Sequence, residues 1–176
     1  MTPPIHLKEV FAKYIDTIDH PIVALETGCS YAFVDECMFN LSTLNIIEHL
    51  VKPTNGILYS LDIDAKKIDI CKHNLELRGL DKYVQFLQGD SVDRINGLPT
   101  DLKVNFVWHD SAEDSDHALA EFNAIQKNLT KKHVICVDDF GTTSVKWQAI
   151  TDKLFLKGYL IDKFETQTGL IVGLQN

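Results

Sequence analysis

The stretch that decides the fold is Val23-Ala24-Leu25-Glu26-Thr27-Gly28-Cys29-Ser30. It begins as an apolar run and ends abruptly in Glu-Thr-Gly, which is typical of a buried parallel strand that stops at a tight turn beside a ligand. Gly28 would let the backbone turn and come close to a bound molecule, because it has no Cβ. Glu26 would lie at the carboxyl end of the strand, where open α/β sheets bind ligands. An ordinary strand-to-helix turn is the alternative reading.

Length and composition indicate one globular domain. The chain has 176 residues, of which 45% are hydrophobic and 24% charged, so we expect a single domain over 1–176 with 1–20 as a helical extension. The net charge of -8 argues against nucleic acid and against a polybasic membrane contact. The 4 cysteines include no Cys-x-x-Cys pair, which favours neither a zinc site nor a disulfide framework. We therefore expect a cytoplasmic protein without a membrane partner.

Apolar runs and helical stripes alternate along the rest of the chain. Ser42 is a candidate N-cap of the helix that follows an enlarged loop after Gly28. The runs predict strands at 22–26, 57–64, 83–87, 104–108, 133–137, 159–166 and 170–174, and helices at 4–18, 44–51, 65–78, 115–129 and 143–157. Five strand-helix alternations followed by a hairpin predict a parallel doubly wound sheet with an antiparallel insertion at one edge.

Acidic residues follow each of the five apolar runs that we expect to be parallel. Because the carboxyl ends of parallel strands meet at one edge of a sheet, we expect these acids to line a single crevice. A cationic cofactor, a metal ion or a polyhydroxyl ligand would offset their charge. The alternative is that they cap the following helices. The acids are Glu26, Asp62, Asp90, Asp110 and the pair Asp138-Asp139.

The order of these features, over nearly all of 22–174, resembles the class I S-adenosylmethionine-dependent methyltransferases. The chain is most similar to the small-molecule O-methyltransferases of the catechol and cephalosporin-tailoring groups. The resemblance implies a single-domain Rossmann-like fold, with a mostly parallel seven-stranded sheet of order 3-2-1-4-5-7-6, an antiparallel C-terminal hairpin and helices on both faces. It rests on Leu25-Glu26-Thr27-Gly28, Leu58-Tyr59-Ser60-Leu61-Asp62-Ile63-Asp64, Gln88-Gly89-Asp90-Ser91, Val107-Trp108-His109-Asp110-Ser111 and Val137-Asp138-Asp139.

The same resemblance implies a site for S-adenosylmethionine. Asp62 matches the acid that accepts hydrogen bonds from both ribose hydroxyls, and the sulfonium cation suits a carboxylate-lined pocket. Residues 29–33 replace most of the family's glycine-rich loop. The implied cofactor residues are Glu26, Gly28 and Ser30 near the methionine part, Asp62 at the ribose, Asp90 and Ser91 beside the adenine, and Asp110.

The metal-using members of the family imply a second group of candidates. Asp110, Asp138 and Asp139 match their ligands for a divalent cation, and hard oxygen ligands suit Mg²⁺. The alternative is that Asp138 or Asp139 caps the next helix or accepts hydrogen bonds from loop amides. Asp110, His109 and His117 are the candidate catalytic acid–base residues, and the alternative for each histidine is a surface or helix-start position without a catalytic role. Glu113 stands where the catechol-type pattern has a lysine.

Three functions follow from these patterns. The first is methylation of a hydroxyl on a small molecule or sugar. The second is an NAD(P)-dependent oxidoreductase. Dinucleotide sites place their acid roughly 20 residues after the glycine, whereas Asp62 lies farther than that from Gly28. The third is a non-catalytic cofactor-binding module of the same fold. The oligomeric state is open, and a homodimer is one of its alternatives.

Overall fold

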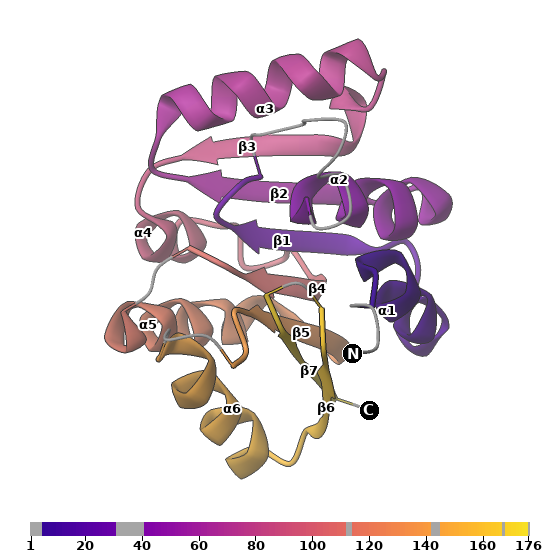
Figure 1. Ribbon diagram of the computed structural model, residues 1–176. Coiled ribbons are helices and arrows are strands. Elements are labelled where there is room, and N and C mark those ends of the chain that lie inside the picture. Colours follow the sequence, from indigo (N-terminus) through magenta and orange to yellow (C-terminus); the bar gives the residue numbers. More distant parts are fainter. Residues whose placement is uncertain (1–4, 31–40, 112–113, 142–144, 167, 176) are drawn as a thin grey trace.

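The sheet is the centre of the molecule. A computed structural model describes residues 5–30, 41–111, 114–141, 145–166 and 168–175. Within these ranges the strands form a seven-stranded sheet of order β3-β2-β1-β4-β5-β7-β6 (Figure 1). This confirms the predicted strand order. The strands are β1 (Val23–Thr27), β2 (Ile57–Asp62), β3 (Val84–Gln88), β4 (Val104–His109), β5 (Leu129–Asp138), β6 (Leu160–Phe164) and β7 (Leu170–Gln175).

The register brings the ends of the central strands together. β1 pairs in parallel with β2 on one side and with β4 on the other, so that Thr27 lies opposite both Leu61 and His109. The chain order therefore reverses at β1, which is where open α/β sheets leave a crevice. β7 pairs with β5 antiparallel, with Asp138 opposite Leu170, and β6 completes the predicted hairpin.

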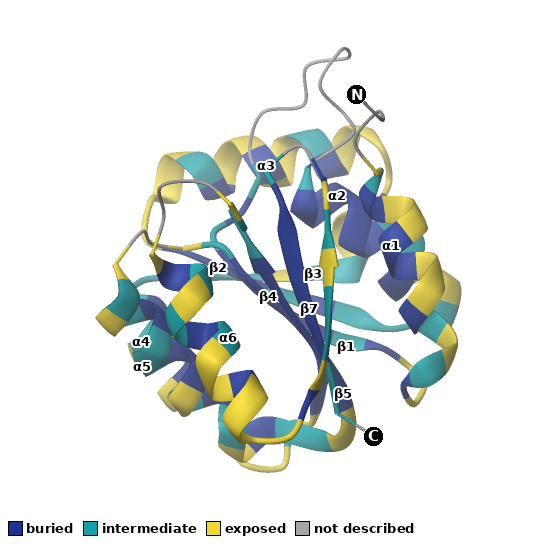
Figure 2. Cartoon of the chain, turned by 60° about the horizontal axis from the view of Figure 1, so that its bottom comes forward, coloured by how far each residue is buried: buried dark blue, intermediate teal, exposed yellow. Residues whose placement is uncertain are grey.

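Helices cover both faces of the sheet. One hydrophobic cluster packs α1, α2 and α3 on one face, and a second packs α4, α5 and α6 on the other. Figure 2 shows the central strands buried between these layers, with exposed residues on the outer sides of the helices. Helix α4 was not predicted, because six residues are too few for a periodic stripe. The helices are α1 (Leu7–Tyr14), α2 (Ser42–Ile46), α3 (Ala65–Leu77), α4 (Ser91–Asn96), α5 (Ser115–Ile125) and α6 (Lys146–Leu156).

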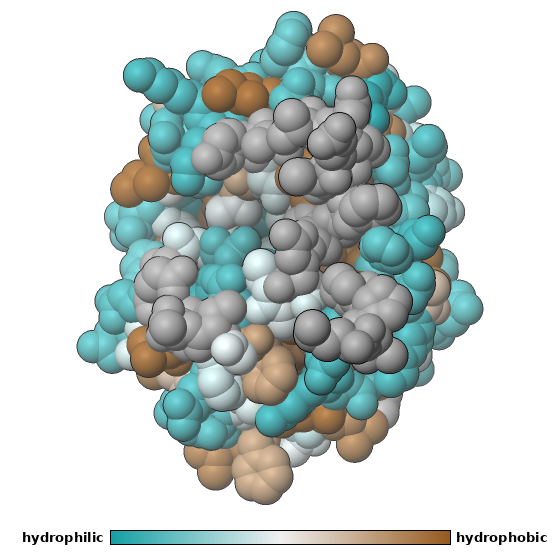
Figure 3. Space-filling view, viewed as in Figure 1, coloured by the Kyte–Doolittle hydropathy of each residue, from teal (hydrophilic) through white to brown (hydrophobic). Residues whose placement is uncertain are grey.

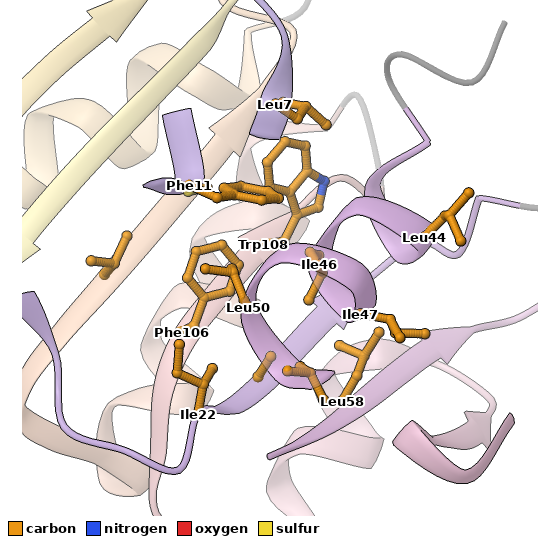
Figure 4. Packing of buried hydrophobic residues seen from close by; sticks show 14 of the residues in the cluster. Leu7, Phe11, Ile22, Leu44, Ile46, Ile47, Leu50, Leu58, Phe106 and Trp108 are labelled. Carbon is orange, nitrogen blue, oxygen red and sulfur yellow. The ribbon is translucent and has the colours of Figure 1, made fainter. Parts of the chain in front are cut away.

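Helix α1 is fixed to the first face of the sheet. Phe11 lies edge-on to the rings of Phe106 and Trp108 on β4, at centroid distances of 5.5 and 6.0 Å (Figure 4). Such aromatic pairs contribute about 0.5–1.5 kcal/mol beyond the area that they bury. Lys13 and Tyr14 both donate hydrogen bonds to the carboxylate of Asp162 on β6. The N-terminal helix therefore packs as part of the domain core.

The predicted N-cap role of Ser42 is wrong. Ser42 is the first residue of α2, and Leu41 occupies the cap position without a side-chain hydrogen bond. The Ser42 hydroxyl instead donates to Glu26 Oε1 at 2.5 Å. Ser42 therefore lies one position too late to cap the helix, and its hydroxyl proton is donated to a buried carboxylate, which needs donors. Most of the enlarged loop before α2 lies outside the described residues.

The outer surface is mixed in character. On the face drawn in Figure 3, hydrophilic residues predominate among those described, and hydrophobic ones are scattered between them. None of the helices that can be described is long and apolar enough to cross a membrane.

Candidate functional site

A cavity of about 690 Å³ opens at the carboxyl ends of β1, β2, β3 and β4. Pockets of roughly 300–1,000 Å³ hold small molecules and cofactors in proteins. The structure brings most of the predicted site residues together here. The cavity is lined by the cofactor candidates Gly28, Ser30, Asp62, Asp90, Ser91 and Asp110 and by the base candidate His117.

Gly28 is required by the neighbouring strand. Its φ of +85° is unfavourable for any residue with a side chain, and a Cβ here would overlap the backbone oxygen of Asp110. The close approach is held by two backbone hydrogen bonds, from Gly28 N to Leu61 O at 2.8 Å and from Asp110 N to Thr27 O at 3.0 Å. The sequence pattern explained the need for glycine by the close approach of a ligand. The structure shows a second reason, which is the close approach of the end of β4.

Asp62 is a buried carboxylate with capacity left for a ligand. The backbone N–H of Cys29 donates to its Oδ2 at 3.1 Å, and that of Asp64 donates to its Oδ1 at 2.8 Å. Each carboxylate oxygen can accept more than one hydrogen bond. Asp62 is 9% exposed and lines the cavity. It is therefore suited to accept two hydroxyl groups of one ligand.

Asp90 caps a helix and also lines the cavity. Its Oδ1 accepts a hydrogen bond from Asp93 N at 3.1 Å, so it caps α4 as the alternative interpretation stated. It nevertheless lines the cavity, beside Ser91. Capping a helix therefore does not remove Asp90 from the cavity lining.

Glu26 lies apart from Asp62, Asp90 and Asp110, which line the cavity. It is fully buried on the α2 face and is not among the residues that line the cavity. Hydroxyls of Ser42, Thr43 and Ser60 donate to it at 2.5, 2.8 and 2.8 Å. Burial raises its pKa to about 7, although these donors oppose the shift. Thr43 also accepts from Ser30 N at 2.9 Å, so Glu26 holds the cavity wall at Ser30 indirectly.

A second buried glutamate lies on the opposite face. Glu121 of α5 is 1% exposed and accepts hydrogen bonds from hydroxyls of β1, α4 and the segment after β4. Burial alone would raise its pKa, but the hydrogen bond and charge of His109 and the hydroxyl donors lower it to about 2. Its partners are Thr27 at 3.2 Å, Ser111 at 2.5 Å, Ser91, and the imidazoles of His109 and His117, each at 3.4 Å.

Sequence reasoning missed Glu121, although the signal was present. Glu121 stands within the buried stripe of Ala118, Phe122 and Ile125. A charged residue in the apolar stripe of a helix requires buried partners. The stripe therefore marks Glu121 as a polar centre, while its partners come from other elements.

The two histidine candidates differ in position. His109 is 1% exposed, faces Glu121 and Phe122, and is not part of the cavity lining. Its Nε2 has no hydrogen-bond partner among the described residues. His117 lines the cavity, and its Nε2 lies 2.9 Å from Ser91 Oγ. Of the two histidines, His117 is thus the one placed where it could exchange a proton with a ligand.

The acids at the ends of β4 and β5 lie close to the ammonium group of a lysine. Lys146 Nζ lies 2.8 Å from Asp110 Oδ1 and 2.8 Å from Asp139 Oδ2, and the residue is 2% exposed. Burial alone would lower the pKa of Lys146, but the two carboxylates outweigh it and raise the pKa above its usual value. Asp138 Oδ1 accepts from Thr168 Oγ1 at 2.6 Å and from Asp139 N at 2.9 Å. Neither aspartate caps α6, whose cap position is Val145.

This arrangement does not fit the predicted Mg²⁺ site. An ammonium already binds oxygens of two of the three expected ligands. Among the residues that the structure describes, no group of three or more His, Cys, Asp or Glu is arranged to hold a metal ion. Glu113, at the position of the family's lysine, lies outside the described residues.

Sequence reasoning also missed Lys146, although the sequence indicates its burial in the same way as it does for Glu121. Lys146, Ile150 and Leu154 are spaced by four residues and are all buried on one face of α6. A lysine at the start of such a stripe is predicted to be buried and therefore paired. The sequence does not say with which carboxylates.

Comparison with solved structures identifies the fold. No protein-family model and no curated protein sequence matches the chain. Among solved structures, a methyltransferase from Geobacter sulfurreducens matches with a TM-score of 0.72 at 10% identity, over 96% of this chain and 76% of its own. An O-methyltransferase from Bacillus cereus in complex with SAH matches with 0.69 at 18% identity, over 96% and 80%. A protein described as an rRNA methylase from Clostridium thermocellum matches with 0.71 at 14% identity, over 99% and 97%.

These likenesses agree with the sequence resemblance. The chain has the Rossmann-like fold of the class I S-adenosylmethionine-dependent methyltransferases.

Proposed function

We propose that this protein, which has a methyltransferase fold, is an S-adenosylmethionine-dependent methyltransferase that methylates a hydroxyl of a small molecule or sugar. One observation carries the proposal. Asp62, at the end of β2, is oriented by two backbone N–H groups and presents its remaining acceptor capacity to a cavity of about 690 Å³. A ribose offers the matching pair of hydroxyls.

The remaining lining residues fit the rest of this cofactor. Asp90 and Ser91 lie beside Asp62 at the end of β3, where the adenine would bind. Gly28 and Ser30 border the end of β1, where the methionine part would bind. The cofactor supplies a methyl group on a sulfonium cation, and a cavity lined by Asp62, Asp90 and Asp110 favours a positive charge.

The chain's own chemistry on the acceptor side centres on Asp110. Burial and the nearby Asp138 carboxylate raise the pKa of Asp110 to about 7, although Lys146 opposes the shift. A base with a pKa near the working pH is well suited to take the proton of an acceptor hydroxyl. His117 lines the same cavity and is the second candidate. Most of the acceleration would come from holding the acceptor oxygen in line with the methyl group.

Isothermal titration calorimetry with S-adenosylmethionine, SAH and NAD⁺ tests the cofactor. We expect the first two to bind and NAD⁺ not to bind. Asp62→Ala should weaken S-adenosylmethionine at least tenfold, because it removes two charge-assisted hydrogen bonds. The matched control is Asp69→Ala, which removes an equal charge from the exposed side of α3 and should leave the affinity unchanged.

Binding of NAD⁺ in place of S-adenosylmethionine would contradict the proposal and favour an oxidoreductase. Transfer is tested separately, with methyl-labelled S-adenosylmethionine and a panel of phenols, catechols and sugars. Label should appear on a hydroxyl of a member of this panel. Cofactor binding without transfer to any member would instead favour a non-catalytic module.

A further inference from the structure

Lys146 is a buried cation fixed between the ends of β4 and β5. Its two contacts, 2.8 Å to Asp110 Oδ1 and 2.8 Å to Asp139 Oδ2, have the length of charge-assisted hydrogen bonds. Ile150 and Leu154 bury the same face of α6 in the core. The position of the ammonium is therefore determined by the packing of the helix on the sheet.

The ammonium and a divalent cation would need the same oxygens. Mg²⁺ binds carboxylate oxygens at about 2.0–2.1 Å in near-octahedral geometry. Here Asp110 and Asp139 each direct one oxygen to Lys146, while Asp138 Oδ1 accepts from Thr168 and from the backbone of Asp139. A divalent ion would have to displace a cation whose stem is buried, since the Lys146 side chain is 3% exposed.

We propose that Lys146 takes the place of a divalent cation at the acceptor side of the cavity, so that this protein needs no metal ion. Lys146 is then a positioning residue that holds Asp110 at the cavity and offsets its charge. Asp110 and Asp139, whose oxygens the ammonium now binds, are the carboxylates that a hard divalent cation could take up once the ammonium is removed. The catalytic part of this proposal rests on the proposed function, whereas the cation-binding part does not.

Mn²⁺ serves as the probe, because it prefers oxygen ligands and its bound and free forms are distinguished by electron paramagnetic resonance. Lys146→Met removes the charge and keeps an unbranched apolar stem. We expect this variant to bind one Mn²⁺ at least tenfold more tightly than the wild type. Lys146→Arg, which keeps a cation, should behave as the wild type does.

A double variant, Lys146→Met with Asp139→Asn, should lose the gained affinity because one ligand charge is removed. Asn is tolerated at this position, where φ is +66°. A wild type that binds Mn²⁺ as tightly as Lys146→Met, or a folded Lys146→Met that gains no affinity, would overturn the proposal. Folding of each variant is checked by circular dichroism and urea unfolding.

Thermal unfolding gives a second readout that does not depend on activity. Addition of Mg²⁺ should raise the Tm of Lys146→Met, since a ligand that binds only the folded state stabilises it. The Tm of the wild type should be the same with Mg²⁺ and with EDTA. An equal rise in both proteins would count against the proposal.

Measurements of turnover then test the catalytic part of the proposal. They use an acceptor found in the screen with methyl-labelled S-adenosylmethionine. Wild-type kcat should be unchanged in EDTA, and Lys146→Met should lose at least tenfold in kcat and recover part of it with Mg²⁺. A wild type that requires Mg²⁺ would overturn the proposal. Failure of the wild type to bind S-adenosylmethionine would refute the proposed function instead, and would leave the Mn²⁺ result standing.

Discussion

Two glutamates lie buried on opposite faces of the sheet at β1, and each collects three hydroxyl donors. Glu26 points to the α2 face, where its donors are Ser42, Thr43 and Ser60. Glu121 reaches the other face from α5 and also contacts the imidazoles of His109 and His117. The pKa of Glu26 is raised to about 7, whereas that of Glu121 is lowered to about 2.

The difference shows what a buried carboxylate needs in order to stay charged. Three hydroxyl donors do not offset the loss of hydration at Glu26. The addition of His109, which supplies a hydrogen bond and charge, reverses the direction of the shift at Glu121. Both centres shape the cavity, since Glu26 supports Ser30 through Thr43 and Glu121 binds Ser91, Ser111 and His117.

The largest expected effect comes from removing the charge of Glu121. Glu121→Gln should lower the free energy of unfolding by about 3 to 4 kcal/mol at pH 7, because it removes the buried carboxylate that accepts from three hydroxyls and contacts His109 and His117. Urea unfolding measures the change. The control is Glu76→Gln on the exposed side of α3, which should cost less than about 0.5 kcal/mol. Equal losses in the two variants would show that the imidazoles do not stabilise the charge.

The dependence of stability on pH below pH 5 gives a second test of the charge on Glu121. A carboxyl whose pKa is lowered by folding stabilises the protein above its unfolded pKa, and this contribution is lost as the pH falls. For Glu121 the window lies between its ordinary value of 4.5 and about 2, and its size is roughly 3 kcal/mol. The difference in unfolding free energy between the wild type and Glu121→Gln should shrink across this window.

Glu26 should give the opposite pH dependence. Its pKa is raised by folding, so the folded state binds the proton more tightly and stability declines as the pH rises from 4.5 to about 7. Glu26→Gln should remove up to about 3 kcal/mol of that decline. Urea unfolding of both proteins at pH 5 and pH 8 measures it. Parallel curves for the wild type and Glu26→Gln would mean that Glu26 keeps its ordinary pKa when buried.

The smallest effects come from single hydroxyl donors. Ser60→Ala removes a donor to Glu26, and should cost about 2 kcal/mol at pH 8, where the acceptor is charged, and about 1 kcal/mol at pH 5, where it is protonated. Thr27→Val removes a donor to Glu121, and its cost should not change between these pH values. The comparison fails if the cost of Ser60→Ala is also independent of pH.

The fold could be predicted because its signals are local. Apolar runs that end in acids mark the parallel strands, and the hairpin over 159–174 marks the antiparallel edge. The placement of Asp62, Asp90 and Asp110 at one cavity follows from the shared edge of parallel strands. That reasoning was wrong in expecting the same of every strand-end acid, since Glu26, Asp138 and Asp139 lie outside the cavity lining.

The partners of the buried charges could not be predicted. Glu121 lies 94 residues from Thr27, and Lys146 lies 36 residues from Asp110. Their apolar stripes indicate that both are buried, but no local pattern selects the groups that they contact. The expected magnesium ligands are an example. The sequence shows the three acids, but it does not show that Lys146 binds two of them.

The sequence by itself therefore determined the strands, the helices and the edge at which acids gather, while its resemblance to the methyltransferases implied the strand order and the layers of helices. Only the tertiary structure decided which carboxylates face the cavity, which are enclosed by hydroxyls and which are paired with a cation. The reason is physical. Side-chain periodicity assigns a residue to a face, whereas its charge state depends on partners within about 4 Å, which packing brings from distant parts of the chain.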